Sequence, residues 1–402
     1  MKENSRTFLC LASFEKGFDF LIECKNQGNR VLLVTSDSLK NVNWPKDYID
    51  EIFYMPDNNN EWNIDDLVKS VSFLARTEDI YRIIALDDFD VEKAAKLREH
   101  LRIPGMGDTT ARYFRDKLAM RIKAEDDGLP IPNFVHVLNH NRINAFLENN
   151  KPPYILKPRS QAGAIGLKKC ESSDEAWDAI NKLGDEQSLY LIEEFIEGNI
   201  YHVDSIIIDR KIKFAQVHEY ALPPFEVAHK GRVFCSRTVN KGSIEEKGLK
   251  QLNQKVIKSL GLKKGVSHTE FIKDKEGKFY FLETSARVGG ANLSNLIEES
   301  TGINMWKEWA VIENLNDGEE YALPKQKNLF GAIIISLAKQ EWPDLNNYNN
   351  DEVVWKLNKK FHAGLVLVSK EYKKMKELSD SFIERFYKDF FTTQPIKDKV
   401  SS

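Results

Sequence analysis

Short apolar runs alternate with amphipathic stretches over the first hundred residues. Thr7–Ala12 and Arg30–Thr35 are rich in Leu and Val, which predicts buried β-strands. Between them, Phe14, Phe18 and Leu21 recur at the spacing of one helix face. Strands that alternate with helices in this way predict a parallel sheet covered by helices.

The pattern changes after a turn at Ile103–Gly107, because Pro and Gly interrupt regular structure. A helix is predicted over Thr110–Asp126, and Leu129–Pro132 ends it. Pro153–Asp204 then reads as strand, Gly-containing loop, helix and strand. A longer β-rich part follows and ends with Lys278–Thr284.

A third part begins after about Asn316. Phe330–Leu337 and Phe361–Val368 predict two further strands, and Glu371–Phe390 predicts an amphipathic helix. The chain therefore divides into three consecutive parts.

Composition excludes several classes of protein. The 402 residues include 58 Lys and Arg against 61 Asp and Glu, a net charge of −3, with 42% hydrophobic residues. This balance is typical of a globular protein and argues against a dedicated nucleic-acid binder. Apolar runs such as Ala332–Ile335 are far shorter than the ~20 residues of a membrane helix. The first residues lack the apolar core of a signal peptide, so we expect a cytoplasmic protein without a membrane partner.

Common catalytic signatures are also missing. The sequence has no P-loop, no Gly-rich dinucleotide fingerprint after the first strand, no G-x-S-x-G elbow and no H-E-x-x-H motif. Four separated cysteines, without a C-x-x-C pair, predict reduced thiols rather than a zinc site or a disulfide framework: Cys10, Cys24, Cys170 and Cys235.

Three segments carry residues suited to nucleotide chemistry. Lys157 ends a predicted strand and precedes the small-residue loop Gly163–Gly166, whose backbone N–H groups can approach phosphate. Glu193 ends another strand and can accept from the exocyclic amine of adenine, with Ile192 and Ile196 against the ring. Taken singly, a surface lysine before a flexible hairpin and an edge strand with solvated acids are the more common interpretations.

The third segment is a predicted hairpin with two carboxylates. Glu270 and Glu283 lie on strands joined by a turn at Glu276-Gly277, so they are expected side by side on one face. A divalent cation would relieve their repulsion, and Mg²⁺ prefers such oxygen ligands. Arg287 follows with a permanent charge suited to a phosphoryl group. A solvated charged face is the alternative, but the flanking aromatic residues favour burial.

Together these segments resemble the ATP-grasp superfamily, in its carboxylate–amine ligase branch with biotin-carboxylase-like architecture, over residues 80–320. The resemblance rests on Arg115-Asp116-Lys117, the Lys157 strand with its loop, the Glu193–Gly198 hinge, Glu270, and the run from Glu283 to Gly290. It implies an α/β and α+β fold. The expected parts are a parallel-sheet domain at 1–109, a two-lobed ATP-grasp domain at 110–320 with its lid at about 130–200, and an α+β subdomain at 321–402.

The resemblance also implies roles for individual residues. Arg287 and Lys157 would be catalytic. The implied ATP-binding residues are Lys117, Lys157, Gly163, Ala164, Ile165, Gly166, Glu193, Glu194, Phe195, Ile196 and His202. The implied metal ligands are Glu270, Glu283 and Ser285.

Two positions depart from the family pattern. Ser285 stands where many members have a metal-binding Asn, and Ile200 stands where many have a ribose-binding Glu. His202 or Asp204 is a substitute for the ribose ligand, although a structural role for His202 is as good an interpretation.

The activity implied is ligation of a small carboxylate, such as an amino acid, to an amine through an acyl phosphate, releasing ADP and phosphate. ATP and Mg²⁺ would be required, with two ions expected and Mn²⁺ as an alternative. The partners would be small-molecule substrates, and homodimers are common in the family.

Gln216, His218, Glu219 and an anion-binding loop within Phe225–Arg237 are candidates for the acceptor pocket. A biotin-type carboxylase and a non-catalytic ATP-binding module remain alternatives.

Overall fold

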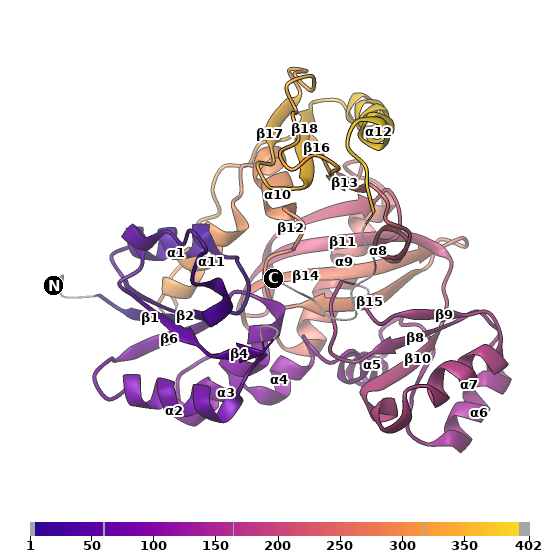
Figure 1. The fold of residues 1–402 in the computed structure, drawn as a ribbon, viewed down its shortest axis with the longest axis horizontal. Helices are drawn as coiled ribbons and strands as arrows, with labels where there is room; N and C mark the ends of the chain where they lie inside the picture. The colour runs from indigo at the N-terminus through magenta and orange to yellow at the C-terminus, as the bar shows by residue number, and fades with distance from the viewer. Residues whose placement is uncertain (1–4, 59–60, 164, 317, 394–402) are drawn as a thin grey trace.

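The computed structural model describes residues 5–58, 61–163, 165–316 and 318–393. Within them, the strands form two four-stranded sheets, one eight-stranded sheet and a two-stranded ribbon of β4 (Asp57–Asn58) and β5 (Glu61–Trp62). In Figure 1, the large sheet lies in the middle. The N-terminal four-stranded sheet lies on its left, and the second four-stranded sheet, with helices α6 and α7, lies at the lower right. The chain is a mixed α/β fold, as predicted.

The N-terminal sheet is parallel, in the order β3-β2-β1-β6. All six residues of β1 are buried, because helices cover both faces of the sheet. The helix α1 packs on one face, whereas α2 and α3 pack on the other. The elements are β1 (Thr7–Ala12), α1 (Phe18–Asn26), β2 (Arg30–Ser36), β3 (Glu51–Met55), α2 (Ile64–Leu74), β6 (Ile80–Ala85) and α3 (Val91–Leu101).

A small antiparallel sheet, in the order β7-β10-β8-β9, forms the separate lobe at the lower right of Figure 1. Its helix α7 is capped by Ser172, whose hydroxyl oxygen accepts from the Glu175 N–H at 3.1 Å. The elements are β7 (Phe134–His136), α6 (His140–Asn149), β8 (Tyr154–Pro158), β9 (Lys168–Cys170), α7 (Ser173–Asn181) and β10 (Tyr190–Glu194).

The eight-stranded sheet runs in the order β15-β14-β11-β12-β13-β16-β18-β17. Its last three strands come from the C-terminal part of the chain, and β16 joins them to β13 through antiparallel pairing. The strands are β11 (Gly198–Ile208), β12 (Lys211–Tyr220), β13 (Phe234–Thr238), β14 (Lys264–Asp274), β15 (Phe279–Ser285), β16 (Phe330–Leu337), β17 (Val353–Lys356) and β18 (His362–Ser369). The helices that pack around them are α5 (Lys117–Asp126), α9 (Ile244–Leu260), α10 (Leu293–Thr301), α11 (Met305–Asn314) and α12 (Tyr372–Asp389).

Two sequence predictions are wrong in their local detail. The helix predicted over Thr110–Asp126 is broken into α4 (Asp108–Arg112) and α5, because Asp116 caps α5 and accepts from the N–H of Leu118 at 3.0 Å. The expected loop within Phe225–Arg237 begins instead with the helix α8 (Pro224–Lys230).

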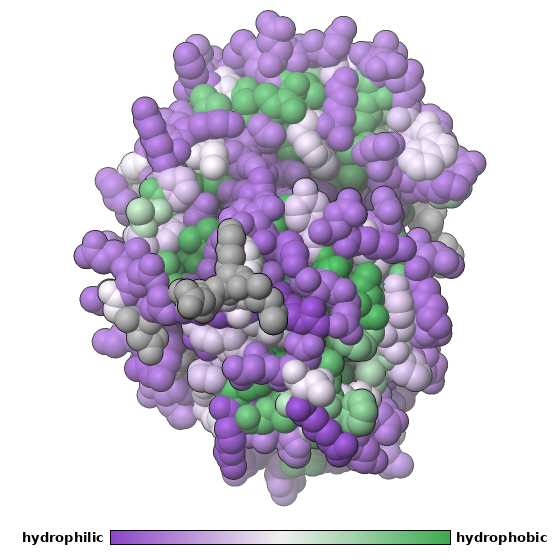
Figure 2. Space-filling view, turned by 90° about the vertical axis from the view of Figure 1, so that its left-hand side faces the viewer, coloured by the Kyte–Doolittle hydropathy of each residue, from purple (hydrophilic) through white to green (hydrophobic). Residues whose placement is uncertain are grey.

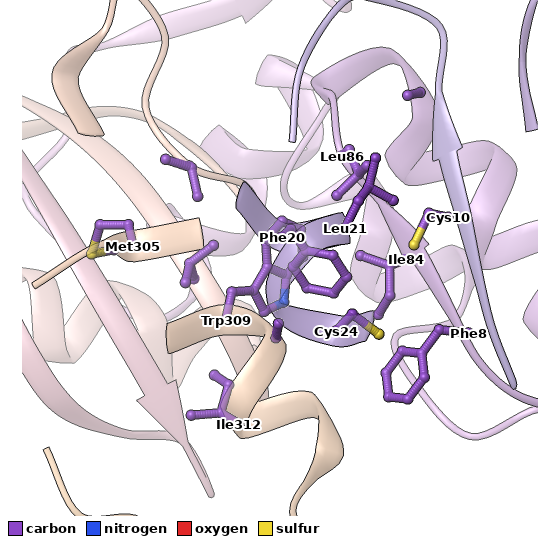
Figure 3. Packing of buried hydrophobic residues seen from close by; sticks show 14 of the residues in the cluster. Phe8, Cys10, Phe20, Leu21, Cys24, Ile84, Leu86, Met305, Trp309 and Ile312 are labelled. Carbon is purple, nitrogen blue, oxygen red and sulfur yellow. The ribbon is translucent and has the colours of Figure 1, made fainter. Parts of the chain in front are cut away.

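The N-terminal sheet and the large sheet share one hydrophobic core. Phe20 of α1 packs edge-on against Trp309 of α11, with ring centroids 5.2 Å apart (Figure 3). Ile206, Phe214 and Val266 of the large sheet belong to the same buried cluster. This core fixes the position of the N-terminal sheet relative to the face of the large sheet described below.

None of the helices in the described residues is long and apolar enough to cross a membrane. The face shown in Figure 2 is mostly hydrophilic, and its apolar patches are interrupted by polar side chains.

Candidate active site

One face of the large sheet carries an unusual row of polar side chains. Strand pairing places Glu283, Glu270, His202, His218 and Thr238 directly beside one another on β15, β14, β11, β12 and β13. Cross-strand partners project from the same face, so this row crosses five strands. The alternation of side chains along each strand adds Asp204, Tyr220, Ser236, His268 and Ser285 to that face.

The two carboxylates stand opposite each other, because the register of the hairpin shifts by one residue between Glu270 and Phe271. The Lys117 Nζ lies 2.9 Å from the Glu283 Oε2 and donates to the Gln161 carbonyl at 2.7 Å. The Tyr220 hydroxyl donates to Glu270 at 2.9 Å. Burial raises the pKa of Glu283, but Lys117 and Lys157 outweigh it and hold that pKa well below its usual range. Two opposed carboxylates are a donor set that fits Mg²⁺.

A buried charge cluster lies where the small lobe meets the large sheet. Lys157 of β8 forms an ion pair with Glu193 of β10, and the Arg121 Nη2 lies 2.9 Å from the Glu193 Oε2. Arg121, which is completely buried on α5, also donates to the Leu282 carbonyl of β15. Burial first, and the charge of Arg121 second, lower the pKa of Lys157. Arg121 therefore ties the two sheets together at this point.

In the predicted adenine hinge, successive side chains of β10 point to opposite faces of the small sheet. Glu193 projects inward, whereas Glu194 accepts from the Asn133 N–H at 3.0 Å on the outside. The Phe195 N–H donates to the Pro153 carbonyl at 3.1 Å, and Ile196 is half-buried. Gly198 must be glycine, since a Cβ there would lie 2.1 Å from the Lys273 carbonyl oxygen.

The predicted phosphate loop joins β8 to β9. Gly163 and Gly166 have φ of 68° and 70°, the left-handed backbone that favours glycine. The Ile165 N–H donates to the Ala162 carbonyl at 3.4 Å. Ala164 lies outside the described residues.

Three histidines gather around Asp204. Its carboxylate oxygens lie 2.7 Å from the His202 Nδ1 and 2.9 Å from the His268 Nδ1. The His202 Nε2 is 2.7 Å from the Ser236 hydroxyl, and the His202 and His218 rings stack with centroids 4.7 Å apart. Burial lowers the pKa of His268, but Asp204 outweighs it and raises that pKa to about 9.

These contacts correct the prediction that His202 contacts the nucleotide. The side chain has no exposed surface and both ring nitrogens are engaged, so His202 is a structural histidine. The structure also does not place Glu219 where the predicted acceptor pocket requires it. It projects from the opposite face of β12, beside Tyr201 and Arg237, whereas Gln216 and His218 share the site face.

His202, Asp204 and His218 offer ligand atoms within 4.8 Å of one another, but they do not fit a metal centre. The His202 and His218 rings stack with an interplanar angle of 21°, so their lone pairs lie in two separate, nearly parallel planes and one ion cannot lie in both. Both oxygens of Asp204 already accept hydrogen bonds.

Arg287 meets the N-terminal part of the chain. Its Nε and Nη2 donate to the Asp88 Oδ2 at 2.8 and 2.5 Å, and its Nη1 donates to the Val288 carbonyl at 3.0 Å. Next to it, Gly289 packs so closely on the histidine cluster that a Cβ would lie 2.9 Å from the Asp204 Oδ1.

Sequence reasoning missed several of these residues. Arg121 stands one helical turn after Lys117, and the i, i+2 spacing of His202 with Asp204 and of His268 with Glu270 marks one strand face. These spacings were the sequence features from which the residues could have been predicted. No sequence feature of Asp88 indicated that it would pair with Arg287.

Comparison with known proteins gives a consistent result. Residues 150–295 match the family model of the ATP-grasp domain. An L-arginine-specific L-amino acid ligase of Bacillus subtilis is 26% identical over 231 residues, which are 56% of this chain and 55% of that protein. A D-alanine--D-alanine ligase of Aquifex aeolicus (strain VF5) is 30% identical over 161 residues, 37% of this chain and 50% of that protein. The chain thus spans about half the length of these curated relatives.

Solved structures share the fold along nearly the whole chain. The crystal structure of an L-amino acid ligase from Bacillus licheniformis superposes with a TM-score of 0.76 at 18% identity, covering 98% of this chain and 100% of that one. The biotin carboxylase domain of the Hydrogenobacter thermophilus 2-oxoglutarate carboxylase, in complex with MgADP, ADP and bicarbonate, gives a TM-score of 0.69 at 15% identity, covering 94% and 89%.

Proposed function

Because the chain contains an ATP-grasp domain, we propose that it is an ATP-dependent ligase that joins a small carboxylate to an amine. The γ-phosphoryl group of ATP moves to a carboxylate oxygen and gives an acyl phosphate and ADP. The amine nitrogen then attacks the acyl carbon, the C–N bond forms, and phosphate and a proton leave. The observation that supports this most is the opposed pair Glu270 and Glu283, with Lys117 beside it.

ATP would bind between the small sheet and the large sheet. Lys117 and Lys157 supply positive charge for the phosphates, and the Gly163–Gly166 loop supplies backbone N–H groups. The backbone of Glu193–Ile196 would meet the adenine edge. Ile200 lies opposite Ile272 and offers no polar atom to the ribose from its side chain.

Glu270 and Glu283 would hold Mg²⁺, as one ion or two, with Mn²⁺ as an alternative, and Ser285 on the same face is a third candidate ligand. The metal supplies positive charge to phosphate oxygens. Arg287 would stabilise the transferred phosphoryl group through charge-assisted hydrogen bonds.

We extend the proposal to organisation and setting. The domains would be 1–109, 110–320 and 321–402, and the protein would act as a homodimer in the cytoplasm, where ATP and Mg²⁺ are available.

The test is ADP and phosphate release from Mg-ATP in the presence of pooled amino acids as carboxylates and amines. We expect release that depends on both, and Glu283→Ala should abolish it. Glu219→Ala is the matched control, since it removes the same side chain from the opposite face of the same sheet. Release of AMP and pyrophosphate, or release without substrates, would contradict the proposal.

Two further outcomes point to the alternative activities. ATP cleavage that needs bicarbonate and rises with biotin would identify a carboxylase. Nucleotide binding without turnover over a broad panel would identify a non-catalytic module.

A further inference from the structure

A salt bridge joins the N-terminal part of the chain to the proposed active site. Asp88 belongs to a short 3₁₀ segment, Asp88–Asp90, which follows the strand β6, and Arg287 follows β15. The two residues are 199 positions apart in sequence. Both are buried, with side-chain exposures of 5% for Asp88 and 12% for Arg287.

The bonds of Arg287 leave a defined edge of the guanidinium unused. The group has five N–H donors. The Nε–H and one N–H of Nη2 point to Asp88, and one N–H of Nη1 points to the Val288 carbonyl. Within the described residues, one N–H on each terminal nitrogen is left over, and Asp88 does not occupy the outer edge, which carries one N–H of each of these nitrogens. Such an edge can bind two oxygens of a phosphate or carboxylate at once.

Asp88 is held in place by its surroundings. Two residues on, the fully buried Asp90 accepts from the Ser13 N–H at 2.8 Å and so ties the 3₁₀ segment to the end of β1. The core shared by α1 and α11 fixes β1 relative to the large sheet. Asp88 is therefore part of a rigid support and not a mobile surface acid.

Charges around the pair keep both partners ionised. Burial raises the pKa of Asp88, but Arg287 and then Arg115 outweigh it and lower that pKa strongly. Burial lowers the pKa of Arg287, but Asp88, Asp87 and Asp204 outweigh it and raise that pKa. The Asp88 Oδ1 has no hydrogen-bond partner in the described part of the chain, so the carboxylate is committed to Arg287 through Oδ2 alone.

We propose that Asp88 is a positioning residue that orients Arg287, so that the two outer N–H groups of the guanidinium face the phosphoryl group handled by the site. This inference rests on the proposed function, because that function gives Arg287 its ligand. It adds that the N-terminal part contributes directly to phosphoryl recognition, through a side chain that does not itself touch the phosphate.

The test measures the affinity of inorganic phosphate for the full chain in the presence of MgADP, by calorimetry. We expect Arg287→Ala to abolish the phosphate affinity and Asp88→Ala to lower it on the order of 10–100-fold, since a misdirected guanidinium loses its two-point contact. Asp88→Ala in the Arg287→Ala background should have no further effect, because Asp88 acts through Arg287. Thermal unfolding of each variant shows that it is folded.

Two more variants separate geometry from charge. Asp88→Asn keeps an oxygen acceptor and removes the negative charge, so it should restore much of the affinity lost in Asp88→Ala. Asp37→Asn is the matched control, because it removes a carboxylate charge from the same N-terminal part at a residue that pairs with Lys40 instead, and it should bind phosphate like the unaltered protein.

The outcomes distinguish the two proposals. If Asp88→Ala binds phosphate as tightly as the unaltered protein or more tightly, Asp88 acts only through its charge or not at all, and the positioning role is overturned while the proposed function stands. If Arg287→Ala binds phosphate normally, the role of Arg287 in the proposed function is overturned, and the role of Asp88 falls with it.

Discussion

The two ends of one sheet face contrast sharply. On β11, β12 and β14, Ile206, Phe214 and Val266 pack against the N-terminal part of the chain. Two to four residues further along the same strands, the same face carries Asp204, His218 and other polar groups. Both ends are buried, so burial alone does not distinguish a core from a site. The difference lies in whether the buried atoms need partners.

The physical cost differs between the two ends. The apolar end gains stability from area removed from water, and its contacts are not directional. At the polar end, each buried donor or acceptor needs a partner, because an unpaired one costs free energy. Asp204, His202, His268 and Ser236 meet this need among themselves. This hydrogen-bonded network lies on the sheet face that carries the proposed active site.

The largest effect is expected at the apolar end. Trp309→Ala should lower the free energy of unfolding by about 3–5 kcal/mol, because it removes a buried aromatic side chain from the core shared with Phe20. Urea denaturation measures this. Ile244→Ala, at an α9 position that is 73% exposed, is the control and should stay within about 0.5 kcal/mol. A loss below about 1 kcal/mol in Trp309→Ala would show that the two parts of the chain do not depend on this core.

At the carboxylate pair of the polar end we expect function to suffer more than stability. Glu283→Gln should slow substrate-dependent ADP release ~10²–10³-fold, about 2.7–4 kcal/mol in transition-state stabilisation, if Glu283 holds the metal. Its free energy of unfolding should fall by less than this, because the loss of the ion pair with Lys117 is partly offset by the end of the repulsion from Glu270. Retained turnover with lost stability would reverse the contrast between the ends.

A change in the histidine cluster should also lower stability, but by less than Trp309→Ala does. Asp204→Ala should lower the free energy of unfolding by about 1–3 kcal/mol, because His202 and His268 lose their common acceptor. Asp204→Asn, which keeps one oxygen, should cost less. Equal stability of Asp204→Ala and the unaltered protein in urea would mean that the polar end is not held together by this network.

A conservative change at the apolar end should have a still smaller effect. Ile206→Val removes one methylene from a fully buried side chain, and we expect a loss of about 0.5–1.5 kcal/mol in unfolding free energy. Turnover should be unchanged, because Ile206 lies two residues from Asp204 but packs into the other cluster. A large loss of turnover would show that the two ends are coupled.

The last prediction concerns the thiols of the apolar end, where we expect no reaction at all in the folded protein. Cys10 and Cys24 are completely buried, and burial raises the pKa of Cys24 to about 12. Raising the pH from 7 to 9 should therefore not increase alkylation by iodoacetamide, since the thiolate is the reactive form. Mass spectrometry measures the labelling, and urea-unfolded protein is the control. Rapid labelling of folded protein at pH 7 would show that this core opens.

The sequence predicted elements well where their signal is local. The expected strands Thr7–Ala12 and Phe330–Leu337 coincide with β1 and β16, and the expected turn at Glu276-Gly277 joins β14 to β15. Glu270 comes to lie opposite Glu283 only through a shift in register between Glu270 and Phe271, which the sequence did not signal. The prediction failed where local signals competed. Good helix formers around Lys117 favoured one long helix, but the cap at Asp116 starts a new one.

Periodicity along the chain thus determined which side chains share a face, because alternation in a strand is a property of neighbouring residues. It could not determine which charges meet. Arg287 pairs with Asp88 across 199 residues, and Arg121 reaches the Leu282 carbonyl across 161. Only the packing of the sheets against one another brings such groups together, because a contact between distant segments depends on the arrangement of every element between them.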